Sequence, residues 1–169
     1  MKVIDDVLTE EEYKKLYDLV MSPFYAWYWN DQSTGDDPVT ENGYNYSQFV
    51  HIVIGDDTIR DGVSFEALHP LFLSLGCKQI YRCKLNLNVY DPSMGDKLHG
   101  APHVDMLEEM NTAIYYVNET DGDTFFFEDE VTRISPKPNR AVTFNSMIKH
   151  AGAPPKLHKR RVVININYK

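Results

Sequence analysis

The chain has 169 residues, of which 43% are hydrophobic and 25% charged, so it can bury the core of one domain and is too apolar to be disordered. Its formal net charge of −8 argues against nucleic acid as a partner, because phosphate binding needs clustered cations. The N-terminus lacks the apolar core of a signal peptide and no apolar run reaches the length of a membrane span, so we expect a cytoplasmic protein without membrane contact.

The N-terminal half predicts two helices and a strand. Residues 9–21 place apolar side chains at helical spacing, and Thr9 and Glu12 have the spacing of a capping box. Residues 48–54 are strand-like, and we expect a second helix within residues 64–75, before a glycine. The helical face that carries the apolar side chains should pack on a sheet.

Two further segments of this half are less regular. The aromatic run of residues 24–29 favours the core of a strand over a binding platform. Residues 30–47 are polar and rich in turn formers, and a loop of this length in a compact domain is usually functional or mobile. A lid over a site and a mobile insertion remain equally open for this loop.

A strand is predicted for residues 80–90 by strict alternation. From residue 81 onward its odd positions are apolar, and the other face carries the polar Arg82, Lys84, Asn86, Asn88 and Tyr90. Because successive side chains of a strand point to opposite faces, the apolar face should pack on the helices. The polar face is either solvated or lines a wet cavity.

The second half is expected to be almost entirely β. Short strands are predicted between turn signals, over residues 112–118, 124–128, 131–134, 140–145 and 161–168. Strands of this length and spacing indicate a sandwich or barrel.

His103 and Asp105 lie two residues apart in an extended segment, so both side chains can share one face and one metal ion. His150, at the end of a later strand, is the candidate third ligand. Two histidines and one carboxylate with open positions form the facial triad of non-haem iron(II) oxygenases. Arg161 opens the last strand, where a guanidinium could pair bidentately with the carboxylate of a co-substrate.

An ordered set of motifs resembles the 2-oxoglutarate and Fe(II)-dependent dioxygenases, most closely the prolyl 4-hydroxylase-like branch with its small bacterial and phage members. The motifs are His103-Val104-Asp105, Asp121-Gly122-Asp123-Thr124-Phe125, Pro136 to Phe144, His150, and Arg161-Val162-Val163-Ile164-Asn165. The resemblance implies a mainly β (α+β) fold, a double-stranded β-helix or jelly-roll, cupin-like barrel with N-terminal helices packed outside.

One domain is expected over residues 1–169. In this division, residues 1–79 give helical support and carry the mobile loop of about 30–47, and residues 80–169 form the barrel core with the site. The resemblance further implies that His103, Asp105 and His150 bind Fe(II), with no catalytic residue beyond these ligands.

The co-substrate residues also follow from the resemblance. Arg161 matches the residue that binds the distal carboxylate of 2-oxoglutarate, with Arg160 as its rival. Tyr116 and Tyr90 match further residues of the co-substrate pocket. Asn139 stands where the family often has glycine, although asparagine also tolerates a left-handed turn.

The reaction implied is hydroxylation of an unactivated C–H bond, with 2-oxoglutarate and O2 consumed, succinate and CO2 released, and L-ascorbate as an accessory reductant. A prolyl residue of a peptide or protein is the first expectation for the substrate. A free amino acid, another small metabolite and a modified nucleobase stay open. The acidic residues of 30–47 favour a neutral or basic substrate over nucleic acid.

Two other classes also remain open. A non-catalytic jelly-roll binding module would keep the barrel and lack the chemistry. A zinc hydrolase would use His99, His103 and His150.

Overall fold

The computed structural model describes residues 1–34 and 45–169, so most of the expected 30–47 loop lies outside the described residues. The helices are α1 (Glu10–Val20) and α2 (Gly62–Ser74), with a 3-10 turn η1 (Pro92–Met94). The strands are β1 (Lys2–Ile4), β2 (Tyr28–Asn30), β3 (Gln48–Gly55), β4 (Thr58–Ile59), β5 (Ile80–Val89), β6 (Asn111–Tyr116), β7 (Thr124–Phe127), β8 (Val131–Ile134), β9 (Arg140–Asn145), β10 (His150–Gly152) and β11 (Arg160–Tyr168). In the described part, no helix is long and apolar enough to cross a membrane.

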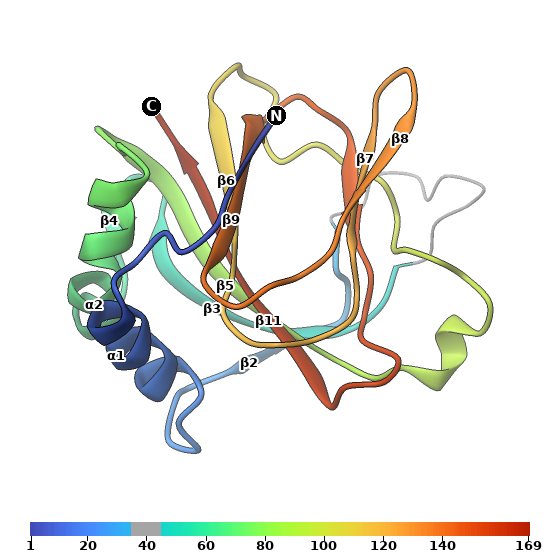
Figure 1. Cartoon of the computed structure of the whole chain (residues 1–169), viewed down its shortest axis with the longest axis horizontal. Coiled ribbons are helices and arrows are strands. Elements are labelled where there is room, and N and C mark those ends of the chain that lie inside the picture. Colours follow the sequence, from blue (N-terminus) through green and yellow to red (C-terminus); the bar gives the residue numbers. More distant parts are fainter. Residues whose placement is uncertain (35–44) are drawn as a thin grey trace.

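Two antiparallel sheets face each other (Figure 1). The main sheet has the strand order β1-β9-β6-β11-β5-β3-β2, with β4 paired to β3, and the smaller sheet has the order β10-β7-β8. This arrangement is the expected double-stranded β-helix. The N-terminal part contributes more than helices, because β1, β2 and β3 all join the main sheet.

The helices cover the outer face of the main sheet, on the side away from β7 and β8 (Figure 1). Thr9 caps α1 through the predicted capping box, since its hydroxyl accepts from the Glu12 N–H while the Glu12 carboxylate accepts from the Thr9 N–H. Leu16 and Leu68 from the two helices are buried in one cluster with Leu85 of β5. This cluster is the main core of the protein.

A second apolar cluster lies between the two sheets. Its buried members are Ile114, Tyr116, Phe126, Val142, Phe144 and Val163. It fills only part of the space between the sheets, and the remainder is the cavity described below.

Strand β5 serves both layers. Cys83 and Leu85 are buried in the core against the helices, whereas Arg82, Lys84 and Asn86 line a cavity on the opposite face. The alternation predicted from the sequence is confirmed, and the wet-cavity interpretation of the polar face is the correct one.

The aromatic run of residues 24–29 was expected to be strand core, and this prediction is wrong for most of the run. Only its end enters β2, and Phe24 is 93% exposed. The reason is position, since β2 is the last strand of the main sheet and pairs on one side only. Aromatic composition alone does not show whether a strand is central or at the edge.

Asn139 ties the N-terminal segment to the barrel. Its φ of +62° lies in the left-handed region, which explains why asparagine can replace glycine there. Its side-chain oxygen accepts from the Leu8 N–H at 3.0 Å and the Tyr115 hydroxyl at 2.9 Å, and its amide donates to the Leu8 carbonyl at 2.8 Å.

We expect Asn139→Gly to keep the turn and to lower the free energy of unfolding by about 2–4 kcal/mol, because three buried hydrogen bonds are lost. Asn139→Ala should cost about 1 kcal/mol more, since alanine is strained at positive φ. Urea denaturation of the three proteins measures both steps. Wild-type stability in Asn139→Gly would show that the side-chain bonds contribute nothing.

The turn before β11 is held by one carboxylate. Asp121 accepts from the backbone N–H groups of Lys156, Leu157 and His158 at 2.8, 2.9 and 3.0 Å. Partial burial alone would raise the pKa of Asp121, but these donors together with the His158 ring lower the pKa to about 2.

Asp121→Ala should lower the free energy of unfolding by about 1–3 kcal/mol at neutral pH. Because the folded pKa lies below the unfolded value of 3.8, this contribution is complete above the unfolded pKa and disappears as the pH falls through about 2. Denaturation of wild type and variant across this range measures the difference. The exposed Asp129→Ala is the matched control, and a difference that persists unchanged at acid pH would contradict the assignment.

Candidate metal centre

The two candidate histidines are placed by a backbone pairing. The His103 N–H donates to the His150 carbonyl at 2.9 Å, and the His150 N–H donates to the His103 carbonyl at 2.8 Å. This antiparallel bridge joins the segment of His103 to β10. Residues far apart in sequence therefore present their imidazoles side by side, with ring centroids 4.7 Å apart.

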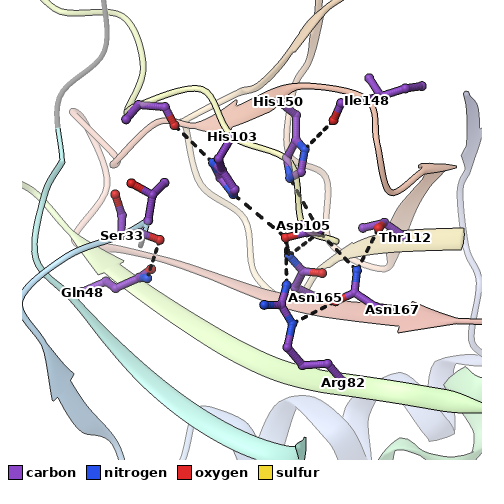
Figure 2. A network of polar contacts seen from close by, with 12 residues as sticks. Ser33, Gln48, Arg82, His103, Asp105, Thr112, Ile148, His150, Asn165 and Asn167 are labelled. Carbon is purple, nitrogen blue, oxygen red and sulfur yellow. Dashed lines mark hydrogen bonds and ion pairs between the residues drawn. The ribbon is translucent and has the colours of Figure 1, made fainter. Parts of the chain in front are cut away.

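Both imidazoles turn their Nε2 atom toward Asp105, the third candidate ligand. The Nδ1 atoms lie 3.1 Å from the Ala101 carbonyl and 3.0 Å from the Ile148 carbonyl, so each Nδ1 carries the proton in the neutral ring. The Nε2 atoms then hold the lone pairs and lie 4.0 Å (His103) and 3.8 Å (His150) from the oxygens of Asp105 (Figure 2).

Asp105 is fixed by groups from the main sheet (Figure 2). Arg82 of β5 donates to its Oδ1 at 2.8 Å, and the Asn165 amide of β11 lies 3.2 and 3.1 Å from the two oxygens. Asn167 donates more weakly at 3.4 Å, while its oxygen accepts from Arg82 at 2.8 Å. No role was predicted for Arg82, Asn165 or Asn167 in holding Asp105. The signal that could have found them is their place at alternate positions of β5 and β11, on the polar face of each strand.

The ionisation of the group suits metal binding. Burial alone would raise the pKa of Asp105, but His150, Arg82 and His103 hold it down at about 2. Burial, with the neighbouring His150, lowers the pKa of His103 to about 4. Near neutral pH the carboxylate is therefore charged and the His103 imidazole neutral, which are the forms that ligate metals.

The three candidate ligand atoms all lie within 4.8 Å of one another. Two nitrogens and one oxygen on one side of an ion form a donor set that suits Fe(II), and three protein ligands leave positions for other molecules. Within residues 1–34 and 45–169, this is the one group of three histidine, cysteine or acidic side chains with such geometry. His99 is not part of it, and its ring packs instead near Phe125 and Phe127, so a zinc site built on His99 is excluded.

Arg161 reaches the same cavity and Arg160 is exposed, so the structure distinguishes the two. The buried Arg161 guanidinium donates to the Gly122 carbonyl at 2.8 Å, Thr124 Oγ1 at 3.0 Å and Asn88 Oδ1 at 3.3 Å. A guanidinium has five N–H groups, so two of them have no acceptor among the described residues and can meet a ligand. Gly122 is required here, because a Cβ would lie 2.5 Å from the Ala153 carbonyl.

The two predicted tyrosines lie elsewhere. Tyr116 is fully buried behind the cavity wall, where its hydroxyl donates to Thr124 at 2.8 Å and its ring lies under the Arg161 guanidinium. Tyr90 is 54% exposed and does not line the cavity. The chain leaves β5 at Val89, so the alternation that was expected to bring Tyr90 inward has already ended.

One cavity of about 240 Å³ contains the His103, Asp105 and His150 side chains and the Arg161 guanidinium. Its floor is the polar face of β5 with Gln48 of β3, and Thr124 and Gly152 line the opposite side. Lys84 also reaches this cavity, and burial together with the cation of Arg82 lowers its pKa to about 8.

Solved structures with the same fold include prolyl hydroxylases. The chain is similar to a prolyl hydroxylase from Trichoplax adhaerens in complex with a hypoxia inducible factor oxygen degradation domain peptide fragment, with a TM-score of 0.69 and 16% identity over 99% of this chain and 82% of that one. For a Pseudomonas putida prolyl-4-hydroxylase the TM-score is 0.60 with 14% identity, over 99% and 91% of the two chains.

The same fold also carries another activity. The non-heme α-ketoglutarate-dependent epimerase SnoN from nogalamycin biosynthesis has a TM-score of 0.65 and 10% identity, over 99% of this chain and 76% of that one. At these identities the comparisons show the fold alone.

The family follows from the sequence itself. No curated protein sequence matches significantly. Residues 85–169, half of the chain, match the sequence profile of the 2OG-Fe(II) oxygenase superfamily, whose cofactors are Fe(II) and 2-oxoglutarate. This segment includes all three residues of the metal-ligand group and Arg161. The chain therefore belongs to the 2OG-Fe(II) oxygenase superfamily.

Proposed function

We propose that the chain is a 2-oxoglutarate-dependent hydroxylase in which His103, Asp105 and His150 hold Fe(II) and Arg161 binds the distal carboxylate of 2-oxoglutarate. The observation that carries this proposal is that a single cavity is lined both by the candidate ligands His103, Asp105 and His150 and by the buried guanidinium of Arg161. Bound Fe(II) supplies the oxidative chemistry by which O2 and 2-oxoglutarate yield succinate, CO2 and a hydroxylated product.

The chain's own residues position and protect the reactants. The two unused N–H groups of Arg161 can pair bidentately with a carboxylate, while Thr124 and Asn88 fix the guanidinium plane. Arg82 keeps Asp105 ionised and oriented. Because these groups are already hydrogen-bonded, little reorganisation is needed when ligands bind.

The role proposed for Tyr116 is indirect. Its hydroxyl holds Thr124, and its ring supports Arg161, so it positions the co-substrate site from behind. Tyr90 has no role in the proposed site. One domain over residues 1–169 is supported by the main core, to which both helices and the strands of the barrel contribute.

A prolyl residue remains the family-level expectation for the substrate, supported by the two prolyl hydroxylases that share the fold. A small polar substrate is the second candidate. It is favoured by the floor of the cavity, where Gln48, Lys84, Asn86 and Asn88 present polar groups.

The purified protein should release succinate from 2-oxoglutarate only when Fe(II) is present. His103→Ala and Asp105→Ala should each lower the rate of succinate release by at least roughly 10- to 100-fold. This is the loss typical when a residue that only orients a metal ligand is removed, and removal of the ligand itself should cost no less. Succinate release measured by mass spectrometry tests this, with the exposed His69→Ala as a matched control.

Unchanged turnover in both ligand variants would refute the metal assignment. In wild type, 2-oxoglutarate should raise the melting temperature only when Fe(II) or Mn(II) is also bound, because the two share one site. The absence of a metal-dependent shift would favour the non-catalytic binding module.

Arg161→Gln should raise the KM for 2-oxoglutarate by about 10- to 100-fold, since charged hydrogen bonds of about 1.5–3 kcal/mol are lost. The adjacent Arg160→Gln is the control and should leave this KM unchanged, because Arg160 is exposed. Initial-rate kinetics with varied 2-oxoglutarate measures both values. The opposite ranking would move the anchor to Arg160.

A further inference from the structure

Two side chains of β5, those of Lys84 and Asn86, line the cavity beside the candidate metal-ligand group and form no hydrogen bond or ion pair with the proposed ligands or with Arg161. Lys84 is paired in register with Asn165 of β11, and Asn86 with Val163. Asn165 in turn donates to both oxygens of Asp105. Lys84 is therefore one residue removed from a proposed metal ligand.

Lys84 feels the charge of Asp105 but forms no direct ion pair with any residue that the structure describes. Among the described residues, it has no hydrogen-bond or ion-pair partner, whereas Arg82 on the same face pairs with Asp105. Asp105 is also the only carboxylate among the described residues that line the cavity. A half-buried ammonium group such as that of Lys84 favours an anionic partner.

Asn86, the second of these side chains, lacks a hydrogen-bond donor for its side-chain oxygen. Its side-chain oxygen is buried and has no hydrogen-bond donor in the described structure, and the same is true of the Asn165 oxygen. Buried acceptors are normally satisfied, so an exception that faces a cavity indicates a ligand. An unpartnered cation and unpartnered acceptors thus lie on one wall.

The proposed cofactors do not neutralise this wall. Fe(II) and the 2-oxoglutarate dianion carry equal and opposite charges, and Arg82 and Asp105 do as well. Arg161 and Lys84 then leave an excess of positive charge in the cavity of a protein whose net charge is −8. A further anion can enter with a favourable local interaction only at Lys84, because Arg161 is assigned to 2-oxoglutarate.

Lys84 can also be reached from outside. It lines a second, outer groove together with residues 29–34, so it lies where this groove meets the inner cavity. The acidic side chain in this groove, Asp31, accepts from the Trp29 indole and forms no pair with Lys84. The position is that of a group that meets an incoming substrate.

We propose that Lys84 and Asn86 bind the primary substrate, and that this substrate is a small molecule with a free carboxylate and a nearby N–H donor, as in a free α-amino acid. Lys84 takes the carboxylate, and the Asn86 oxygen accepts from the amino group. The proposal rests on the proposed function, deepens it by naming the substrate class, and replaces the peptide prolyl residue with a free acid.

The reaction balances without another reactant. A C–H bond of the acid is broken and a C–O bond is formed, with one oxygen atom of O2 entering the product. The other oxygen atom enters succinate as 2-oxoglutarate loses its C1 carboxylate as CO2. Because the anchor lies next to Asn165, the reacting carbon should be only a few bonds from the carboxylate.

A free α-amino acid is a zwitterion whose backbone groups carry no net charge, so this substrate class agrees with the neutral or basic substrate expected from the acidic residues of 30–47. Most of those acids lie outside the described residues, whereas Lys84 and Asn86 are on the cavity wall. Lys84 therefore selects the carboxylate end of such a molecule, because a charge interaction at a partly buried site is screened less than one in open solvent.

The test uses the full-length protein with Fe(II), 2-oxoglutarate and O2. The probes are the proteinogenic amino acids, each paired with its carboxamide, and an end-blocked prolyl peptide. At least one free acid should accelerate succinate release above the substrate-free rate and gain the mass of one oxygen atom. Its carboxamide should have a KM roughly 10-fold higher or more, as for loss of a charge-assisted hydrogen bond.

The variant Lys84→Met should raise the KM for that acid to the level of the carboxamide. It should leave the Mn(II)-dependent thermal shift by 2-oxoglutarate unchanged, and the exposed Lys78→Met should match wild type in both measurements. Asn86→Leu should raise the KM for the free acid and for its carboxamide alike, because both molecules keep the amino group that the Asn86 oxygen would accept from. If Lys84→Met does not fold, Lys84→Gln replaces it.

The inference is overturned if acid and carboxamide are equivalent, if no free acid accelerates turnover, or if only the blocked peptide does so. It is also overturned if Lys84→Met abolishes the thermal shift by 2-oxoglutarate, since Lys84 would then belong to the co-substrate end. Loss of Fe(II)-dependent succinate release from the wild type itself would instead refute the proposed function.

Discussion

The site depends on keeping one carboxylate ionised inside the barrel. Asp105 is buried between two imidazoles and could not stay charged there alone, because burial favours the neutral acid. Arg82 and the Asn165 amide, both from the main sheet, stabilise the charged form. The carboxylate is thus ready for a cation, while neutral His103 contributes a lone pair and no charge. Two sheets must meet at a fixed spacing for this arrangement to exist.

The period of two in a β-strand lets β5 serve two purposes. One face carries Cys83 and Leu85 into the core beneath the helices, and the other carries Arg82, Lys84 and Asn86 into the cavity. Polar groups that face the interior need hydrogen-bond or ion-pair partners, and most of those on this face of β5 have them. The exceptions, Lys84 and the Asn86 oxygen, are therefore informative about what enters the cavity.

Local signals in the sequence were reliable where the local chain determines the outcome. The capping box of Thr9 and Glu12, the alternation of β5 and the left-handed turn at Asn139 all appear as expected. Predictions that depended on distant neighbours were less successful. Tyr90 lies outside the cavity because β5 ends one residue before it, and Tyr116 is packed behind the wall formed by Thr124.

The sequence by itself indicated the candidate donor set of His103, Asp105 and His150 and an arginine on the last strand, because residue type and strand period are local properties. Strand spacing indicated a sandwich or barrel, and the resemblance to a known family chose the barrel. Only the tertiary structure decided that Arg161 and not Arg160 enters the cavity, and that Arg82 and Asn165 hold Asp105. It also decided that Lys84 forms no ion pair with any described residue. These facts depend on the register between β5 and β11, strands far apart in the chain. Their pairing is fixed by burial of the whole sheet and not by any short motif.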